Sequence, residues 1–130
     1  MAHDTIFVQI ASYRDPELVP TVLDCIARAK HPERLKFGIC WQFAEGESIS
    51  QIAHLPQVRF VGVPHQESKG ACWARAIASE LYDGQDFYLQ IDSHHRFVDG
   101  WDEQSIEMLK GLEADGIKKP LLTYASPAAS

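Results

Sequence analysis

The sequence predicts an α/β fold in which a mostly parallel sheet is covered by helices on both faces. Short runs rich in β-branched and aromatic residues alternate with helical patterns along the whole chain, and this alternation is typical of strands joined by helical crossovers. The chain has 130 residues, of which 45% are hydrophobic and 23% charged. A chain of this size and composition can bury a core. We therefore expect one domain, residues 1–130.

The first strand is expected at Thr5–Ser12, in the run TIFVQIAS. Asp15 and Pro16 follow it, and this pair is typical of a helix start. Aspartate can cap the first turn, and proline is tolerated at the first helical position. The helix should run to about Lys30, because Pro32 disfavours helical geometry at the residue before it.

The middle of the chain predicts two further strands. They are expected at residues 35–43 and 58–64, with a short helix at 48–55 between them, because β-branched and aromatic runs favour strands. The three tryptophans are expected in the core or covering the sheet. They are Trp41, Trp73 and Trp101.

The next predicted helix, within residues 67–84, has a narrow apolar stripe. Four residues recur at the helical spacing i, i+3, i+4 and i+7: Ala74, Ile77, Ala78 and Leu81. Because two of them are alanines, we expect this helix to lie close on the sheet. A fourth strand at 86–91, a helix at 100–112 and a fifth strand at 120–124 complete the predicted order.

Charge and cysteine content narrow the class of protein. The formal net charge is -6 and the 12 Lys and Arg are scattered, which argues against a surface that neutralises nucleic-acid phosphates. Cys25, Cys40 and Cys72 show no C-x-x-C spacing, so we expect small buried residues rather than a zinc site or disulfides. Without a signal peptide or a bilayer-spanning apolar stretch, we expect a cytoplasmic protein with no membrane partner.

Polar residues follow three of the predicted strands. Parallel α/β sheets bind ligands beyond the carboxyl ends of their strands. The segments placed there are SYRD after the first strand, HQESKG after the third and DSHHRF after the fourth. These three loops are therefore the expected site.

The loop after the fourth strand carries a candidate metal site. In an extended segment, Asp92 and His94 can face one point while Ser93 and His95 face away. A carboxylate and an imidazole leave the ion open to substrate oxygens, which suits Mn²⁺ or Mg²⁺ bridging a diphosphate. From the spacing alone we favour the alternative, a strand end with a turn-forming aspartate and solvated histidines, because D-x-H is a very short pattern.

The loop after the third strand could hold a phosphate. Lys69 and Gly70 stand at a predicted helix start, and Arg75 follows within the first turns. Free N–H groups and the positive end of the helix dipole favour an anion there. An exposed basic helix with a tight entry turn is the alternative.

The loop after the first strand could meet a nucleoside. Tyr13 could stack on a base and Arg14 could reach a phosphate. Asp15 either accepts a hydrogen bond from a ribose or nucleobase or only caps the following helix, and we favour the cap.

Several segments in this order resemble one family. IASYRDPEL, HPERLKFGICWQ, the run Ser68–Asp102 and KPLLTY resemble the N-terminal half of the glycosyltransferases that put N-acetylglucosamine on hydroxyproline of cytoplasmic proteins, and their bacterial relatives. The resemblance runs from about Ile6 to Tyr124. It implies a Rossmann-like glycosyltransferase-A fold whose nucleotide-binding half precedes an acceptor-binding half. We therefore expect a donor-binding half, truncated at its C-terminal side, that transfers little or no sugar by itself.

The resemblance also implies roles for the candidate residues. Asp92 and His94 fill a D-x-H version of the metal-binding D-x-D motif, and Gly70 and Arg75 fall in the helix that flanks the sugar nucleotide. The loop that usually meets uridine corresponds to four residues: Ser12, Tyr13, Arg14 and Asp15. The segment RFVDGW is similar to the one after the metal motif in mucin-type N-acetylgalactosaminyltransferases.

The expected function is metal-dependent transfer of a sugar, N-acetylglucosamine by the resemblance, from a UDP-sugar to a hydroxyl on a protein or other acceptor. A metal ion held by Asp92 and His94 would neutralise charge on the UDP leaving group. Arg75, with Arg14, would add fixed positive charge, so Asp92 and Arg75 are the expected catalytic residues. The resemblance implies retention at the anomeric carbon.

Two alternatives remain open from the sequence. The first is a noncatalytic module that binds a UDP-sugar or a metal and never turns over. The second is a small histidine-metal protein that uses His65, His94 and His95 and binds zinc without UDP.

Overall fold

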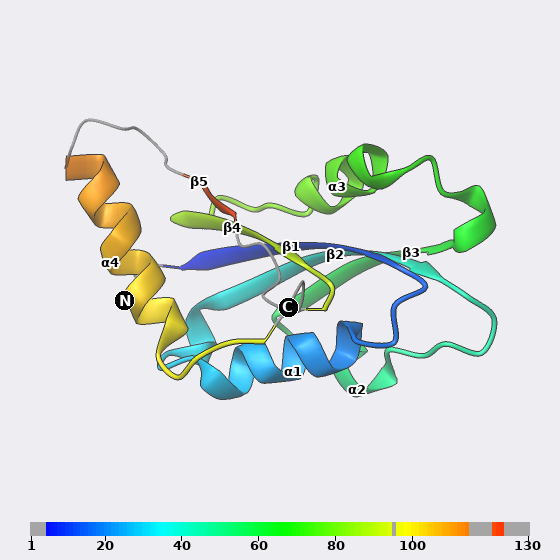
Figure 1. The fold of residues 1–130 in the computed structure, drawn as a ribbon, viewed down its shortest axis with the longest axis horizontal. Helices are drawn as coiled ribbons and strands as arrows, with labels where there is room; N and C mark the ends of the chain where they lie inside the picture. Colours follow the sequence, from blue (N-terminus) through cyan, green and yellow to red (C-terminus); the bar gives the residue numbers. More distant parts are fainter. Residues whose placement is uncertain (1–4, 95, 115–120, 124–130) are drawn as a thin grey trace.

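The computed structural model describes residues 5–94, 96–114 and 121–123 and contains a five-stranded sheet (Figure 1). All strand pairs are parallel, and the order across the sheet is β3-β2-β1-β4-β5. The strands are β1 (Ile6–Tyr13), β2 (Leu35–Phe43), β3 (Val58–Pro64), β4 (Phe87–Asp92) and β5 (Leu121–Thr123). The predicted α/β fold with a parallel sheet is confirmed.

Helices cover both faces of this sheet, as expected. α3 lies on one face, and α1 and α2 lie on the other (Figure 1). The helices are α1 (Leu18–Arg28), α2 (Ser50–Ala53), α3 (Ala71–Ser79) and α4 (Trp101–Ala114), with 3-10 turns at Pro32–Arg34 and His65–Glu67. Of the helices in the described ranges, none is long and apolar enough to cross a membrane.

The larger hydrophobic core lies between the sheet and α1. Alternate residues of β1, Ile6, Val8 and Ile10, are buried in it together with Leu18 and Val22 of α1. α4 adds three residues to the same core: Trp101, Ile106 and Leu109. The other residues of β1 face α3, because successive side chains of a strand point to opposite faces.

Small residues let α3 lie close on its face of the sheet, as the alanine stripe predicted. Ala74 and Ala78 are fully buried and pack with Cys40. Gly38 of β2 contributes as well. A Cβ atom there would lie 2.3 Å from Cζ of Phe7 and 2.9 Å from the carbonyl oxygen of Ala78. A side chain at Gly38 would therefore push the helix or the ring away.

The start of α1 differs from the prediction. The helix begins at Leu18 rather than Pro16, and Glu17 occupies the N-cap position without a side-chain cap. Oδ1 of Asp15 instead accepts a hydrogen bond from the Glu17 amide at 2.9 Å. An aspartate commonly bonds the backbone two residues ahead. Asp15 thus closes a turn before the helix and does not cap it, which corrects the capping prediction.

The cysteine prediction is confirmed at two positions and wrong at the third. Cys25 and Cys40 are buried. Burial raises the pKa of the Cys25 thiol, and the charges of Asp24 and Asp102 raise it further. Burial likewise raises the pKa of Cys40. Cys72 is exposed, because it lies in the first turn of α3 while Ala74 and Ala78 take the sheet-facing positions.

The tryptophans lie in or against the two hydrophobic cores, as expected. Trp101 is buried, and its Nε1 donates to the carbonyl oxygen of Cys25 at 2.8 Å. Trp41 is partly buried against the larger core, and Trp73 packs against the smaller core under α3. The N-terminus of α4 is therefore fastened to α1 through an indole.

Candidate nucleotide-sugar site

The strand order reverses at the centre of the sheet. β2 lies on one side of β1, and β4 lies on the other. The crevice beyond the carboxyl ends of the strands at such a switch point is where open α/β sheets bind ligands. β1 ends at Tyr13 and β4 ends at Asp92. Two of the three predicted loops, those after β1 and β4, therefore begin next to each other at the switch point.

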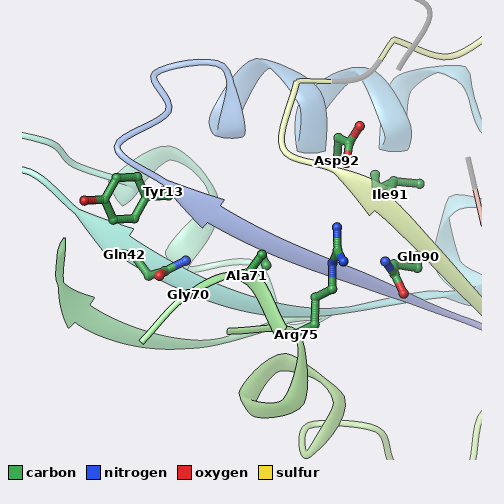
Figure 2. A pocket seen from close by; sticks show the side chains of 9 residues that line it. Tyr13, Gln42, Gly70, Ala71, Arg75, Gln90, Ile91 and Asp92 are labelled. Atoms are coloured by element: carbon green, nitrogen blue, oxygen red, sulfur yellow. The ribbon is translucent and has the colours of Figure 1, made fainter. Parts of the chain in front are cut away.

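A pocket of about 330 Å³ opens here on the α3 face (Figure 2), a volume within the range of small-molecule sites. It brings together four residues predicted from the sequence: Tyr13, Gly70, Arg75 and Asp92. The complete lining is Ala11, Tyr13, Gln42, Gly70, Ala71, Arg75, Gln90, Ile91 and Asp92. Figure 2 shows the Arg75 side chain reaching from α3 toward the end of β4.

Gly70 shapes the entry into α3. Gly70 occupies the N-cap position of the helix, and its φ is +104°. Residues other than glycine rarely adopt this φ. The following residue, Ala71, also lines the pocket. The first turn of α3 thus lies at the pocket, as the anion prediction requires. Lys69 is exposed.

Gln42, which the sequence analysis missed, ties two of the loops together. The backbone carbonyl oxygen of Gln42 accepts a hydrogen bond from the Arg14 amide at 2.8 Å. Its side-chain Nε2 donates to the backbone carbonyl oxygen of Ser12 at 2.9 Å. Its Oε1 accepts from the Ser68 hydroxyl, which itself accepts from the Gly70 amide at 3.2 Å. One side chain on β2 therefore fixes both the end of β1 and the approach to α3.

Gln9 anchors α3 near Arg75 and was missed as well. Nε2 of Gln9 donates to the carbonyl oxygen of Arg75 at 3.1 Å, and the Tyr88 hydroxyl donates to Oε1 of Gln9 at 2.5 Å. Burial, helped by Tyr82, raises the pKa of Tyr88, which keeps this hydroxyl protonated. The backbone from which the Arg75 side chain extends is thus held against the sheet.

A sequence signal for these residues exists. Each of three central strands carries one glutamine inside an apolar run: Gln9 in β1, Gln42 in β2 and Gln90 in β4. Gln9 and Gln90 are direct partners in the β1–β4 register, and Gln42 and Gln90 line the pocket. A polar residue buried in a strand needs a partner, so this pattern indicates a polar face.

The other residues of the first-strand loop lie outside this pocket. Ser12 is fully buried on the α1 side of the sheet, and its Oγ has no hydrogen-bond partner within the described part of the chain. Arg14 is exposed, with φ +48°. Asp15 lines a second pocket of about 410 Å³ between the start of α1 and the segment before α2. Of the four residues predicted for this loop, Tyr13 alone is among the residues that line the first pocket.

The D-x-H segment bends directly after β4. The strand ends at Asp92, and Ser93 and His94 lie in a bend, so the extended geometry expected through His94 is not present. Ser93 is buried, and its hydroxyl donates to Oδ2 of Asp15 at 2.6 Å. Nδ1 of His94 lies 3.1 Å from the same oxygen. His95 lies outside the described residues.

The carboxylate of Asp15 is held in its charged form by its neighbours. Partial burial alone would raise the pKa of Asp15. Hydrogen bonds from the Ser93 hydroxyl, the Glu17 amide and His94 outweigh that effect and leave the pKa below its ordinary value. Asp15 is therefore an ionised acceptor at neutral pH.

The described residues contain no closed metal site. No group of three or more His, Cys, Asp and Glu side chains in the described ranges could hold a metal ion. A closed structural zinc site normally has four protein ligands. Asp92 and His94 would supply one carboxylate and one imidazole, and other ligands would have to come from substrate or water. His65 is one of the histidines of the histidine-metal alternative. Its ring packs edge-on against Tyr13, with ring centroids 5.9 Å apart.

A parallel sheet with a polar pocket at its switch point places this chain among the Rossmann-like α/β proteins. A family model described as glycosyltransferase (GlcNAc) matches residues 5–56 and 51–129. The chain therefore belongs to this glycosyltransferase family. Comparison with curated proteins and with solved structures gave no match. The glycosyltransferase part of the resemblance is thus confirmed, while the hydroxyproline-type specificity and the glycosyltransferase-A fold stay predictions.

Proposed function

We propose that this chain binds a UDP-sugar and serves its metal-dependent transfer to a hydroxyl acceptor. The observation that carries the proposal is the pocket at the β1/β4 switch point, where Tyr13, Gly70, Arg75 and Asp92 converge. The description of the family supports N-acetylglucosamine as the sugar. A hydroxyproline-type protein acceptor and a glycosyltransferase-A fold belong to the same proposal, on the strength of the sequence resemblance.

The pocket offers groups for the base and for the diphosphate of a nucleotide. Tyr13 lies at one side and is 53% exposed, so its ring is available to stack on the base. The first turn of α3 and the Arg75 guanidinium provide N–H donors and positive charge for the diphosphate. Gln9 and Gln42 hold these groups before substrate arrives. Preorganised charge of this kind stabilises a leaving group without reorganisation during the reaction.

The metal belongs at the end of β4. Asp92 and His94 would hold a Mn²⁺ or Mg²⁺ ion, and this ion, when bound, would act as a Lewis acid on the diphosphate. Arg75 projects from α3 toward the same end of β4 (Figure 2). In this proposal, one fixed cationic side chain and one carboxylate that would bind the cation lie around the leaving group.

The first test is UDP binding with and without metal. Because the ion has only two protein ligands in this proposal, diphosphate oxygens must complete its shell, and UDP should bind much more tightly in Mn²⁺ than in excess chelator. Isothermal titration calorimetry of the same preparation in the two buffers measures this difference. Equal affinities would exclude the metal-dependent proposal. Release of free sugar from UDP-N-acetylglucosamine would separate an enzyme from a noncatalytic module.

The second test is Arg75→Ala. A charge-assisted hydrogen bond is worth about 1.5–3 kcal/mol, so UDP affinity should fall roughly ten- to hundredfold. Folding stability should change by about 0.5 kcal/mol or less, because Arg75 is exposed. Arg59→Ala is the matched control, since Arg59 is an exposed arginine on β3 that pairs with Asp83 at 3.6 Å. A folded Arg75→Ala protein with unchanged UDP affinity would remove Arg75 from the site.

A further inference from the structure

The carboxylate of Asp15 connects the first-strand loop to the D-x-H segment. One oxygen, Oδ1, accepts from the Glu17 amide at 2.9 Å. The other, Oδ2, accepts from the Ser93 hydroxyl at 2.6 Å and lies 3.1 Å from Nδ1 of His94. These residues are 78 and 79 positions away from Asp15 in the chain. The contact is therefore made by the fold and not by local sequence.

The bend that carries His94 is also anchored to α1 itself. The hydroxyl of Thr21 donates to the backbone oxygen of Ser93 at 2.8 Å, in a buried hydrogen bond. With the Ser93 hydroxyl on Asp15, the residue before His94 is held through both its side chain and its backbone. The imidazole therefore extends from a fixed backbone.

The contact with Asp15 determines which nitrogen of His94 carries a proton. An ionised carboxylate has acceptor sites only, so a histidine nitrogen facing it must donate. In a neutral imidazole one nitrogen is a donor and the other an acceptor, and a hydrogen bond at one nitrogen selects the tautomer. A proton on Nδ1 leaves the lone pair on Nε2, and a metal ion binds through that lone pair.

We propose that Asp15 is a positioning residue for His94: its carboxylate holds Nδ1–H and presents Nε2 as the atom that coordinates the metal. This inference rests on the proposed function, because it takes His94 as a metal ligand. It assigns Asp15 a role other than binding ribose or base. Carboxylate–histidine pairs of this kind orient metal ligands and raise their basicity, and losing such a partner typically costs 10–100-fold in metal affinity or activity.

The substitution Asp15→Asn tests the inference with little change of shape. The amide oxygen of asparagine can still accept from the Glu17 amide, which directs the NH₂ group toward Ser93 and His94. An NH₂ group donates, so Nδ1 of His94 would become the acceptor and the proton would move to Nε2. Asp99→Asn is the matched control, because Asp99 is an exposed carboxylate paired with Arg28 at 3.0 Å.

The first readout needs neither metal nor substrate. In the metal-free protein near neutral pH, ¹⁵N chemical shifts of the His94 imidazole should report a proton on Nδ1, and Asp15→Asn should move it to Nε2. The measurement on the unmutated protein stands even if the variant does not fold. A wild-type His94 that is protonated on Nε2 and not on Nδ1 would overturn the inference.

The second readout is UDP affinity in Mn²⁺ and in chelator. Asp15→Asn should lower the Mn²⁺-dependent affinity 10–100-fold, leave the affinity in chelator unchanged, and have no added effect in a His94→Ala background. Asp99→Asn should match the wild type. If the wild type binds UDP equally well in Mn²⁺ and in chelator, the proposed function fails. If wild-type binding depends on Mn²⁺ but Asp15→Asn equals the wild type, the inference alone fails.

Discussion

Replacing His94 by alanine should abolish most of the metal dependence of UDP binding, and Asp92→Asn should do the same. Each change removes one of the two protein ligands proposed for the ion, a nitrogen in one case and an anionic oxygen in the other. Even the loss of a partner that only orients a ligand costs about 10–100-fold, so we expect these losses to be at least as large. His95→Ala should have much less effect.

Calorimetric titration of UDP into the three variants, in Mn²⁺ and again in chelator, separates the possibilities. In chelator all three should match the wild type, which shows that the nucleotide pocket is intact. In Mn²⁺ the losses should fall on Asp92→Asn and His94→Ala. Equal losses from the two histidine variants would assign the ligand role to both. A loss confined to His95→Ala would mean that the assignment of the histidines is reversed.

The structural basis for choosing His94 differs from the one the sequence indicates. Alternation along an extended strand predicts Asp92 and His94 on one side, yet β4 ends at Asp92 and His94 lies in a bend. What fixes His94 is its contact with Asp15. A short pattern such as D-x-H predicts side-chain directions only where the strand continues. Beyond the strand end, hydrogen bonds to residues distant in the sequence determine where the side chains lie.

Most of the sheet could be predicted because each strand is an apolar run with clear ends. β2 and β3 occupy the predicted residues 35–43 and 58–64. The start of α1 was less predictable, because Asp15 and Pro16 fit a helix start and an isolated turn equally well. The contact of Asp15 with Ser93, which only the fold creates, helps to fix its carboxylate outside the helix.

Individual site residues were predictable where the sequence marks a strand end or a helix start. Tyr13, Gly70 and Asp92 are at such positions, and Arg75 follows about one turn into α3. The parallel sheet brings all four to one pocket. The hydrogen bonds of Gln42 to both neighbouring loops were not predictable in detail, because they depend on which face of β2 meets α3. The exposed Cys72 shows the same limit. Its apolar neighbours indicate burial, while the direction of its side chain on α3 decides the outcome.

The largest effect on stability is expected from Asp102→Ala. Asp102 is only 1% exposed. Its carboxylate accepts hydrogen bonds from the backbone amides of Lys30 and His31 at 2.7 and 2.8 Å. These amides follow the last turn of α1. Gly100, two residues before Asp102, also bonds to the end of α1: its amide donates to the backbone carbonyl oxygen of Arg28 at 2.8 Å. Asp102 therefore completes the attachment of α4 to α1.

Hydrogen bonds to a charged group contribute about 1.5–3 kcal/mol each, so Asp102→Ala should lower the free energy of unfolding by about 3 kcal/mol or more. Urea denaturation at neutral pH measures this loss. Asp99→Ala is the control from the same segment, because the Asp99 side chain is 84% exposed and its pair with Arg28 is at the surface, where such pairs contribute about 0–1 kcal/mol. If the two variants lose the same stability, the buried carboxylate does not join α1 to α4 as the geometry indicates.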